Sequence, residues 1–217
     1  MQAVLWDMDG VLVDSEPLWT LAEVELAREL GGEWTDEIKA LVVGTRLDVS
    51  VPTILRFYGA PVGPADVAQA AGFLLHRMIE LYRTEPVLMP GARELLTGVR
   101  DAGIPVALVS SSYRALVDSV LAAGVGPFEL TLAGDEVTHA KPHPEPYLTA
   151  ASRLGVDPAR CVVVEDSPSG VAAAEAAGAA VVAVPSVPGV LFDAGPRRLV
   201  ASSLAGVALE DLRALVA

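Results

Sequence analysis

The first fourteen residues constrain the fold of this chain more than any other stretch. The apolar run 3–6 ends in Asp7, Asp9 follows two positions on, and Gly10 comes directly after it. Because side chains alternate along a strand, carboxylates at i and i+2 fall on one side of the strand's carboxyl end. Such neighbours repel each other, so the pair favours a bound cation or one retained proton. Hard oxygen ligands without cysteine or histidine suit Mg²⁺.

Two other interpretations of this stretch stay open on its residues alone. An aspartate followed by a glycine also makes an ordinary turn after a core strand, and short motifs often match by chance. A calcium loop fits less well, because it needs a third oxygen ligand before its glycine, whereas Gly10 follows Asp9 directly. The choice between a metal site, a turn and a calcium loop therefore depends on acidic and basic residues elsewhere in the chain.

The composition predicts a globular protein with a sizeable core. The chain has 217 residues, of which 52% are hydrophobic, enough for one domain or a domain with an insert. No uncharged apolar run approaches the ~20 residues that span a bilayer, and the amino terminus lacks a signal-peptide layout, so we expect a cytoplasmic protein. A net charge of −13 without a basic cluster argues against nucleic acid or an anionic membrane as partner.

Cysteine and lysine are both rare in this chain. Cys161, the single cysteine, begins the apolar run 161–164, so we interpret it as a core residue rather than a nucleophile. The two lysines are Lys39 and Lys141, while arginine supplies the other cationic side chains. These two positions are therefore candidates for a site that needs a compact point charge.

Residues 16–86 predict an all-helical segment. Helices are expected at 16–30, 35–41, 48–58 and 64–83, with glycines after several of them. In the fourth helix, apolar residues recur at steps of three and four, a pattern typical of bundle packing: Val67, Ala71, Leu74, Met78 and Leu81.

From Pro90 onward, helices and strands alternate. Strands are expected at 104–109, 130–133, 161–164, 180–184 and 198–201, and helices at 92–102, 113–123, 144–154, 171–177 and 209–216. This alternation, with Val-rich strands, predicts a parallel sheet buried on both faces. The predicted fold class is α/β, a Rossmann-like three-layer parallel sheet. Residues 1–15 and 87–217 would form the sheet domain, and residues 16–86 an inserted helical cap domain that can cover the sheet's carboxyl edge.

Polar residues collect at the carboxyl ends of the predicted strands. They are Asp7 and Asp9 after the first, Ser110, Ser111 and Ser112 after the second, Lys141 after the third, and Glu165 and Asp166 after the fourth. Carboxylates can hold a metal, hydroxyl and backbone N–H groups can cradle phosphate, and a lysine can neutralise growing charge. We interpret the set as a phosphoryl-transfer site. His139 and His143, which flank Lys141, are expected to be exposed loop residues.

In this order, the motifs resemble those of the haloacid dehalogenase superfamily over essentially the whole chain. Asp7-Met8-Asp9-Gly10 is similar to the first family motif, Ser110 to the second, Lys141 to the third and Glu165-Asp166 to the fourth. The helical segment resembles the family's small C1-type cap. Within the family, the run DMDGVLVDSEPLW is most similar to sugar-phosphate phosphatases such as the 2-deoxyglucose-6-phosphatase group, and less so to β-phosphoglucomutases.

The resemblance implies a Mg²⁺-dependent phosphatase that works through an aspartyl-phosphate. Asp7 would attack phosphorus, and Asp9 would act as acid and base. Ser110, Ser111 and Lys141 would hold the phosphate. Mg²⁺ would be bound by Asp7, the backbone carbonyl of Asp9 and Asp166, with Glu165 as a further ligand or just behind the ligands. We expect the substrate to be a hexose or pentose phosphate and the protein to be a monomer.

Residues of the cap should supply substrate specificity, and alternatives remain there. Glu16, Trp19 and the loop 44–46 are expected to face the site, with Arg46 contacting the distal end of the substrate or simply facing solvent. Trp19 either fills the cap core or stacks on a sugar. A β-phosphoglucomutase-like isomerase is an alternative function, although such mutases carry a cap histidine where this chain has Trp19. A catalytically silent binding protein on the same fold is another.

Overall fold

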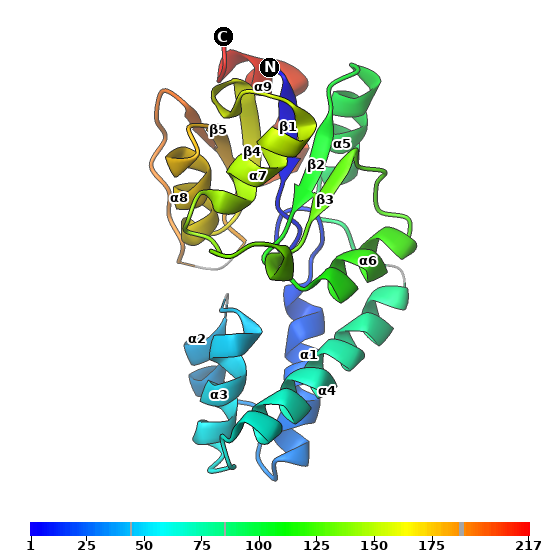
Figure 1. Cartoon of the computed structure of the whole chain (residues 1–217), viewed down its shortest axis with the longest axis vertical. Helices are drawn as coiled ribbons and strands as arrows, with labels where there is room; N and C mark the ends of the chain where they lie inside the picture. The colour runs from blue at the N-terminus through cyan, green and yellow to red at the C-terminus, as the bar shows by residue number, and fades with distance from the viewer. Residues whose placement is uncertain (44, 85, 187–188) are drawn as a thin grey trace.

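A six-stranded parallel sheet forms the centre of the structure, a computed structural model that describes residues 1–43, 45–84, 86–186 and 189–217. The strands are β1 (Ala3–Trp6), β2 (Val106–Val109), β3 (Leu130–Leu132), β4 (Cys161–Glu165), β5 (Ala180–Ala183) and β6 (Arg198–Val200). Their order is β3-β2-β1-β4-β5-β6, and every pair is parallel (Figure 1). The predicted α/β fold class is confirmed.

The central strands are buried along their whole length, as their continuous apolar runs predicted. All residues of β1, β2, β4 and β5 are buried. Burial also raises the pKa of the Cys161 thiol to about 11, so its interpretation as a core residue is confirmed. β1 pairs with β2, the next strand along the chain, on one side and with β4 on its other side. The carboxyl end of β1 is therefore the switch point at which such sheets bind ligands.

Helices cover both faces of the sheet and make three layers (Figure 1). Val4 and Trp6 of β1 pack in one cluster with α5 (Ala92–Asp101), α6 (Arg114–Ala122) and α9 (Leu209–Ala214). Ala3 and Leu5, on the opposite face, pack with α7 (Glu145–Leu154) and α8 (Pro168–Ala176). Short 3₁₀ helices span Gly134–Glu136, Pro158–Arg160 and Leu204–Gly206. The alternation of side chains along β1 thus divides the core in two.

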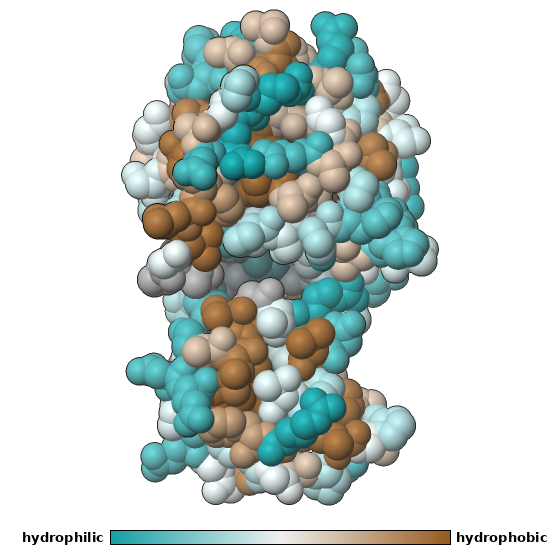
Figure 2. All heavy atoms as spheres, turned by 90° about the vertical axis from the view of Figure 1, so that its left-hand side faces the viewer, coloured by the Kyte–Doolittle hydropathy of each residue, from teal (hydrophilic) through white to brown (hydrophobic). Residues whose placement is uncertain are grey.

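Four helices lie beyond the carboxyl edge of the sheet and form a second lobe. They are α1 (Glu16–Glu29), α2 (Asp36–Val42), α3 (Leu47–Phe57) and α4 (Pro64–Arg83), close to the predicted ranges. Figure 2 shows the molecule hollowed at the waist between the two lobes. No helix in the described ranges combines the length and apolar composition needed to cross a membrane.

The buried stripe of α4 differs from the prediction. Leu74 and Met78 are buried as expected, but the other buried positions are Ala70 and Tyr82. The predicted members Val67, Ala71 and Leu81 are only half-buried at the edge of the core. The reason is that α4 contacts α1 and α3 within its lobe and α6 beside the sheet, so its most buried line follows steps of four.

The two connections of the helical lobe are hydrogen-bonded to each other. The Asp14 N–H donates to the Val87 carbonyl at 2.9 Å, and the Met89 N–H donates to the Leu12 carbonyl at 3.0 Å. Val13 and Leu88 form an antiparallel bridge between them. Glu85, which belongs to the predicted cap domain 16–86 and precedes the second of these connections, lies outside the described residues.

Candidate active site

Lys141 and Asp7 form the centre of the site at the carboxyl end of β1. Asp7 is 6% exposed, and its N–H donates to the Val164 carbonyl at 3.0 Å. The Lys141 ammonium donates to Asp7 Oδ1 at 2.5 Å, to Glu165 Oε1 at 2.7 Å and to the Val109 carbonyl at 3.0 Å. A lysine that would otherwise be an exposed loop residue is thus buried among the ends of three strands.

The carboxyl groups of the site outnumber its lysine. Burial raises the pKa of Asp7 well above its usual range, and Lys141 opposes this rise. Three neighbouring carboxyl groups, those of Glu165, Asp166 and Asp9, add to it. Burial lowers the pKa of Lys141, but its carboxylate neighbours outweigh burial and raise it well above normal, so the ammonium stays charged. We call the carboxyl groups of Asp7, Asp9, Glu165 and Asp166 the acid cluster. Because its negative charges exceed the single positive charge of Lys141, a bound divalent cation would stabilise it.

Three carboxylates are placed where a metal ion could bind. One oxygen from each of Asp7, Glu165 and Asp166 lies within 4.8 Å of the others. Burial, followed by the charge of Glu165, raises the pKa of Asp166 to about 7. Gly10, at a φ of +76°, lets the chain pass close by, because a Cβ there would lie 2.3 Å from Asp166 Oδ2. The donors are all oxygens, so the residues fit Mg²⁺ as predicted.

Glu165 is already hydrogen-bonded through both of its oxygens. Oε1 accepts from Lys141 and from the Tyr147 hydroxyl at 2.6 Å. Oε2 accepts from the Asp166 N–H at 3.0 Å, the Ser167 N–H at 3.2 Å and the Ser167 hydroxyl at 3.1 Å. Of the two predicted roles for Glu165, this bonding favours the one behind the metal ligands, where Glu165 positions Lys141.

Gly170 of α8 should be intolerant of a side chain. A Cβ at Gly170 would lie 1.8 Å from Glu165 Oε1, and the carboxylate cannot retreat without breaking the hydrogen bonds that hold it. We expect Gly170→Ala to lower the free energy of unfolding by about 1–3 kcal/mol. It should also reduce activity, because a displaced Glu165 would displace Lys141. Denaturant unfolding measures the first effect and phosphate release the second.

Gly72 of α4 provides the matched control for this substitution. A Cβ at Gly72 meets nothing within 4 Å, so Gly72→Ala should raise stability by about 0.5–1 kcal/mol through helix propensity. If Gly170→Ala behaves like Gly72→Ala, the tight packing around Glu165 is not real.

Asp9 lies between the sheet and the helical lobe. Its Oδ1 accepts from the hydroxyl of Tyr82 in α4 at 3.1 Å. Its Oδ2 accepts from the Ser112 hydroxyl at 2.7 Å and, at 3.5 Å, from the Ser110 hydroxyl. Burial raises the pKa of Tyr82 well above normal, so this hydroxyl stays a donor to Asp9. Asp9 is thus held by both lobes.

The predicted phosphate-binding serines differ in their contacts. Ser110 is 3% exposed, and its hydroxyl accepts from the Ser112 N–H at 2.9 Å while lying 3.5 Å from Asp9. The Ser111 side chain has no hydrogen bond within the described ranges, and its role stays a prediction. Ser112, which was predicted at the same strand end but without a role of its own, makes the shorter contact to Asp9.

Three residues of the site were missed in the sequence. Tyr82 lies next to Leu81 in the predicted stripe, and a stripe at steps of four through Leu74 and Met78 would have included it. Tyr147 lies in the first turn of α7, six residues after Lys141, and its ring centroid lies 4.9 Å from the lysine ammonium. Ser186, which donates to Asp166, follows β5 without any signal that reveals its role.

The predicted cap residues are paired within the cap. Glu16 Oε1 lies 3.2 Å from the Lys39 ammonium, and Arg46 Nε lies 3.4 Å from Asp48 Oδ1. Gly44, in the loop with Arg46, lies outside the described residues, and contact of either residue with substrate stays a prediction. Trp19 is half-buried against the hydrophobic core, in line with the first of its two interpretations.

His139 and His143 are exposed, as predicted. Their ring centroids are 4.6 Å apart, and His139 Nδ1 lies 2.7 Å from Glu145 Oε2. The Glu145 carboxylate also accepts from the N–H groups of Thr138 and His139. Both histidines therefore serve the loop that carries Lys141 rather than pointing into the acid cluster.

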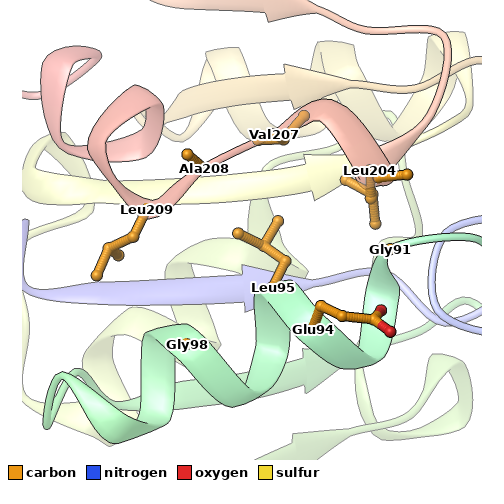
Figure 3. Close-up of a pocket in the computed structure, with 9 residues that line it drawn as sticks. Gly91, Glu94, Leu95, Gly98, Leu204, Val207, Ala208 and Leu209 are labelled. Atoms are coloured by element: carbon orange, nitrogen blue, oxygen red, sulfur yellow. The ribbon is translucent and has the colours of Figure 1, made fainter.

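A separate pocket of about 340 Å³ lies between α5 and the C-terminal segment (Figure 3). It is lined by Gly91, Glu94, Leu95, Gly98, Leu204, Ala205, Val207, Ala208 and Leu209. None of these residues belongs to the acid cluster, and the leucines make the pocket largely apolar.

Several known proteins of similar sequence are phosphatases. The chain is 33% identical over 188 residues to hexitol phosphatase B of Escherichia coli (strain K12), covering 85% of this chain and 83% of that protein. It is 38% identical over 182 residues to hexitol phosphatase A of the same organism, covering 83% and 81%.

A solved structure of similar fold covers nearly the whole chain. CbbY from Rhodobacter sphaeroides in complex with phosphate matches with a TM-score of 0.85 and 29% identity, covering 98% of this chain and 99% of that one. Residues 1–178 also match the model of a family described as haloacid dehalogenase-like hydrolase. This match extends from the first acidic motif through the fourth, so the chain belongs to the haloacid dehalogenase-like hydrolase family.

Proposed function

We propose that this protein is a Mg²⁺-dependent phosphatase that hydrolyses a phosphorylated sugar or polyol through an aspartyl-phosphate. The observation that carries the proposal is the buried contact of Lys141 with Asp7 and Glu165 at the switch point of the sheet. This contact places the candidate nucleophile, Asp7, against the buried ammonium of Lys141, next to Asp166. The names of the similar proteins, hexitol phosphatases among them, support a small polyhydroxy substrate.

In the first step, Asp7 attacks phosphorus. Lys141 holds Asp7 Oδ1, which leaves Oδ2 as the attacking oxygen. As the new P–O bond forms, the ester P–O bond breaks, and the leaving oxygen takes a proton from Asp9. Lys141 and Ser110 neutralise and orient the phosphate oxygens. When bound by Asp7, Asp166 and the Asp9 carbonyl, Mg²⁺ supplies further neutralisation of phosphate charge.

In the second step, Asp9 removes a proton from water. The water oxygen attacks phosphorus, the bond to Asp7 breaks, and inorganic phosphate leaves. The hydroxyls of Tyr82 and Ser112 hold Asp9 in place for both transfers. We also propose that residues 16–86 act as a cap domain on a sheet domain of residues 1–15 and 87–217, because the helical lobe meets the sheet at this edge.

The test is phosphate release across a panel of hexitol and sugar monophosphates, phosphoglycolate, nucleotides and β-glucose 1-phosphate. We expect release that requires added Mg²⁺ and is abolished by EDTA, with excess Mg²⁺ restoring it. Release that persists after exhaustive chelation would contradict the metal-dependent mechanism. Conversion of β-glucose 1-phosphate to glucose 6-phosphate without phosphate release would identify the mutase instead, and silence on every compound would favour a binding protein.

A further inference from the structure

Two of the three histidines of the chain lie in one loop, on either side of Lys141. His139 and His143 precede Glu145, the first residue of α7, and the loop leads along the carboxyl edge of the sheet to this helix (Figure 1). The Lys141 side chain is 4% exposed and contacts the acid cluster, whereas both histidines are exposed to solvent. The loop therefore directs its lysine inward and its two imidazole rings outward.

The two histidines and Glu145 bring three metal-binding atoms together on the solvent side of the loop. One ring nitrogen of each histidine and one Glu145 oxygen lie within 4.8 Å of one another. His139 Nδ1 is already 2.7 Å from Glu145 Oε2, and the ring centroids of the two histidines are 4.6 Å apart. Ligand atoms that surround a tetrahedral ion at roughly 2.1 Å are about 3.4 Å from each other. Rotation of the exposed rings about their soft Cβ–Cγ bonds can close the remaining gaps, which are at most about 1.5 Å.

Glu145 is held in place for this role by the backbone of the loop. Its Oε1 accepts from the Thr138 N–H at 2.7 Å, and its Oε2 accepts from the His139 N–H at 2.9 Å. The Glu145 N–H in turn donates to His143 Nδ1 at 3.2 Å. These bonds fix the carboxylate beside both rings, so little conformational entropy is lost when an ion binds. The ion would replace the contact between His139 Nδ1 and Glu145, and the proton that lies there would leave to solvent.

The donor atoms select a different ion from the one that suits the acid cluster. Imidazole nitrogen binds Zn²⁺ well, and two histidines with one carboxylate leave a fourth tetrahedral position for water. Mg²⁺ prefers oxygen ligands and suits the carboxylates at the sheet edge instead. The net charge of −13 favours the approach of any cation to the surface. The two sets of ligands can thus be told apart by the metal that each prefers.

We propose that His139, His143 and Glu145 form a surface site for Zn²⁺, which fastens the loop of Lys141 from its solvent side. The three ligands lie two residues before, two residues after and four residues after the lysine, so a bound ion closes a ring of chain around it. The ion takes no part in phosphoryl transfer. The site is independent of the phosphatase proposal, and its test does not use turnover.

The first experiment is calorimetric titration of the full chain with ZnCl₂ in excess Mg²⁺. Loss of a residue that merely supports a metal ligand costs 10–100-fold in affinity, so His139→Ala and His143→Ala should each bind Zn²⁺ at least about tenfold more weakly than wild type. Glu145→Gln, which keeps an oxygen for the two backbone N–H groups but loses the charge, should also weaken binding. Because the two histidines are exposed, the metal-free variants should unfold within a degree or two of wild type.

The second experiment tests whether the ion fastens the loop. Saturation with Zn²⁺ should slow amide hydrogen exchange within residues 138–145 by at least about tenfold in wild type. The double variant His139→Ala/His143→Ala should show no such change. In the nuclear magnetic resonance spectrum of wild type, Zn²⁺ should shift the ring signals of His139 and His143.

His76 provides the matched control, because its Nε2 lies 3.4 Å from Glu80 Oε1 and its side chain is 78% exposed. This residue pairs with a carboxylate as His139 does, but it belongs to a separate helix, α4. His76→Ala should bind Zn²⁺ as wild type does, and the His76 ring signals should stay in place. Equal affinity of wild type and the two loop variants, or an equal loss in His76→Ala, would overturn the site. Zn²⁺ binding that excess Mg²⁺ abolishes would place the ion in the acid cluster and would overturn it as well.

Discussion

Asp7→Asn should lose phosphate release almost completely, by at least ~10⁴-fold in kcat. The amide lacks the negative charge that attacks phosphorus, and Glu165, which Lys141 also contacts, already accepts hydrogen bonds through both of its oxygens. Because the substitution keeps the shape of the side chain, the protein should fold normally. Steady-state release of phosphate from the best substrate in the panel measures the effect, with thermal unfolding as the check on folding.

Asp118→Asn is the matched control for this substitution. Asp118 lies on α6, its side chain is 60% exposed, and it pairs with Arg114 at the surface. We expect Asp118→Asn to keep wild-type activity within about twofold, since exposed ion pairs contribute little. Retention of a tenth or more of the wild-type rate by Asp7→Asn would mean that the nucleophile is misassigned.

Lys141→Ala should reduce both activity and stability. Loss of one electrostatic partner of the phosphate typically costs ~10²–10³ in kcat. The lysine is also the cation buried between Asp7 and Glu165, with 4% of its side chain exposed. Removing one partner of a buried ion pair costs about 3–5 kcal/mol, which corresponds to a fall in Tm of roughly 6–20 °C for a chain of this size.

Arg213→Ala separates this effect from the loss of any cation. Arg213 pairs with Glu210 at 3.5 Å, and both side chains are more than half exposed. Its removal should change Tm by no more than a degree or two. Equal stability of Lys141→Ala and wild type would show that the carboxylates around Lys141 do not depend on it for neutralisation.

Most of the fold follows from local sequence patterns. Runs such as 161–164 and 180–184 are apolar throughout, and only strands buried on both faces need that pattern. Once the strands are parallel, their carboxyl ends share one edge, so the meeting of Asp7, Lys141 and Asp166 could be predicted without knowing any distance. Helix boundaries were less certain: α8 begins at Pro168, three residues before the predicted start.

What could not be predicted depends on how helices turn toward the site. Tyr82 bonds to Asp9 across 73 positions of sequence, and its orientation is set by the packing of α4 between two lobes rather than by its own neighbours. Tyr147 and Ser186 likewise act through contacts that spacing does not encode. The burial of Lys141 follows from the same contacts, since a lysine in a loop has no local signal for burial.

The paired connections of the helical lobe have a consequence for how this lobe could be exchanged. Backbone hydrogen bonds join Asp14 to Val87 and Leu12 to Met89, so the chain leaves the sheet and returns to it at one point. A tight turn could therefore join the two connections directly and leave the order of the strands unchanged. The helical lobe could therefore be replaced by that of a relative, with two junctions to design and with the sheet and its acid cluster unchanged.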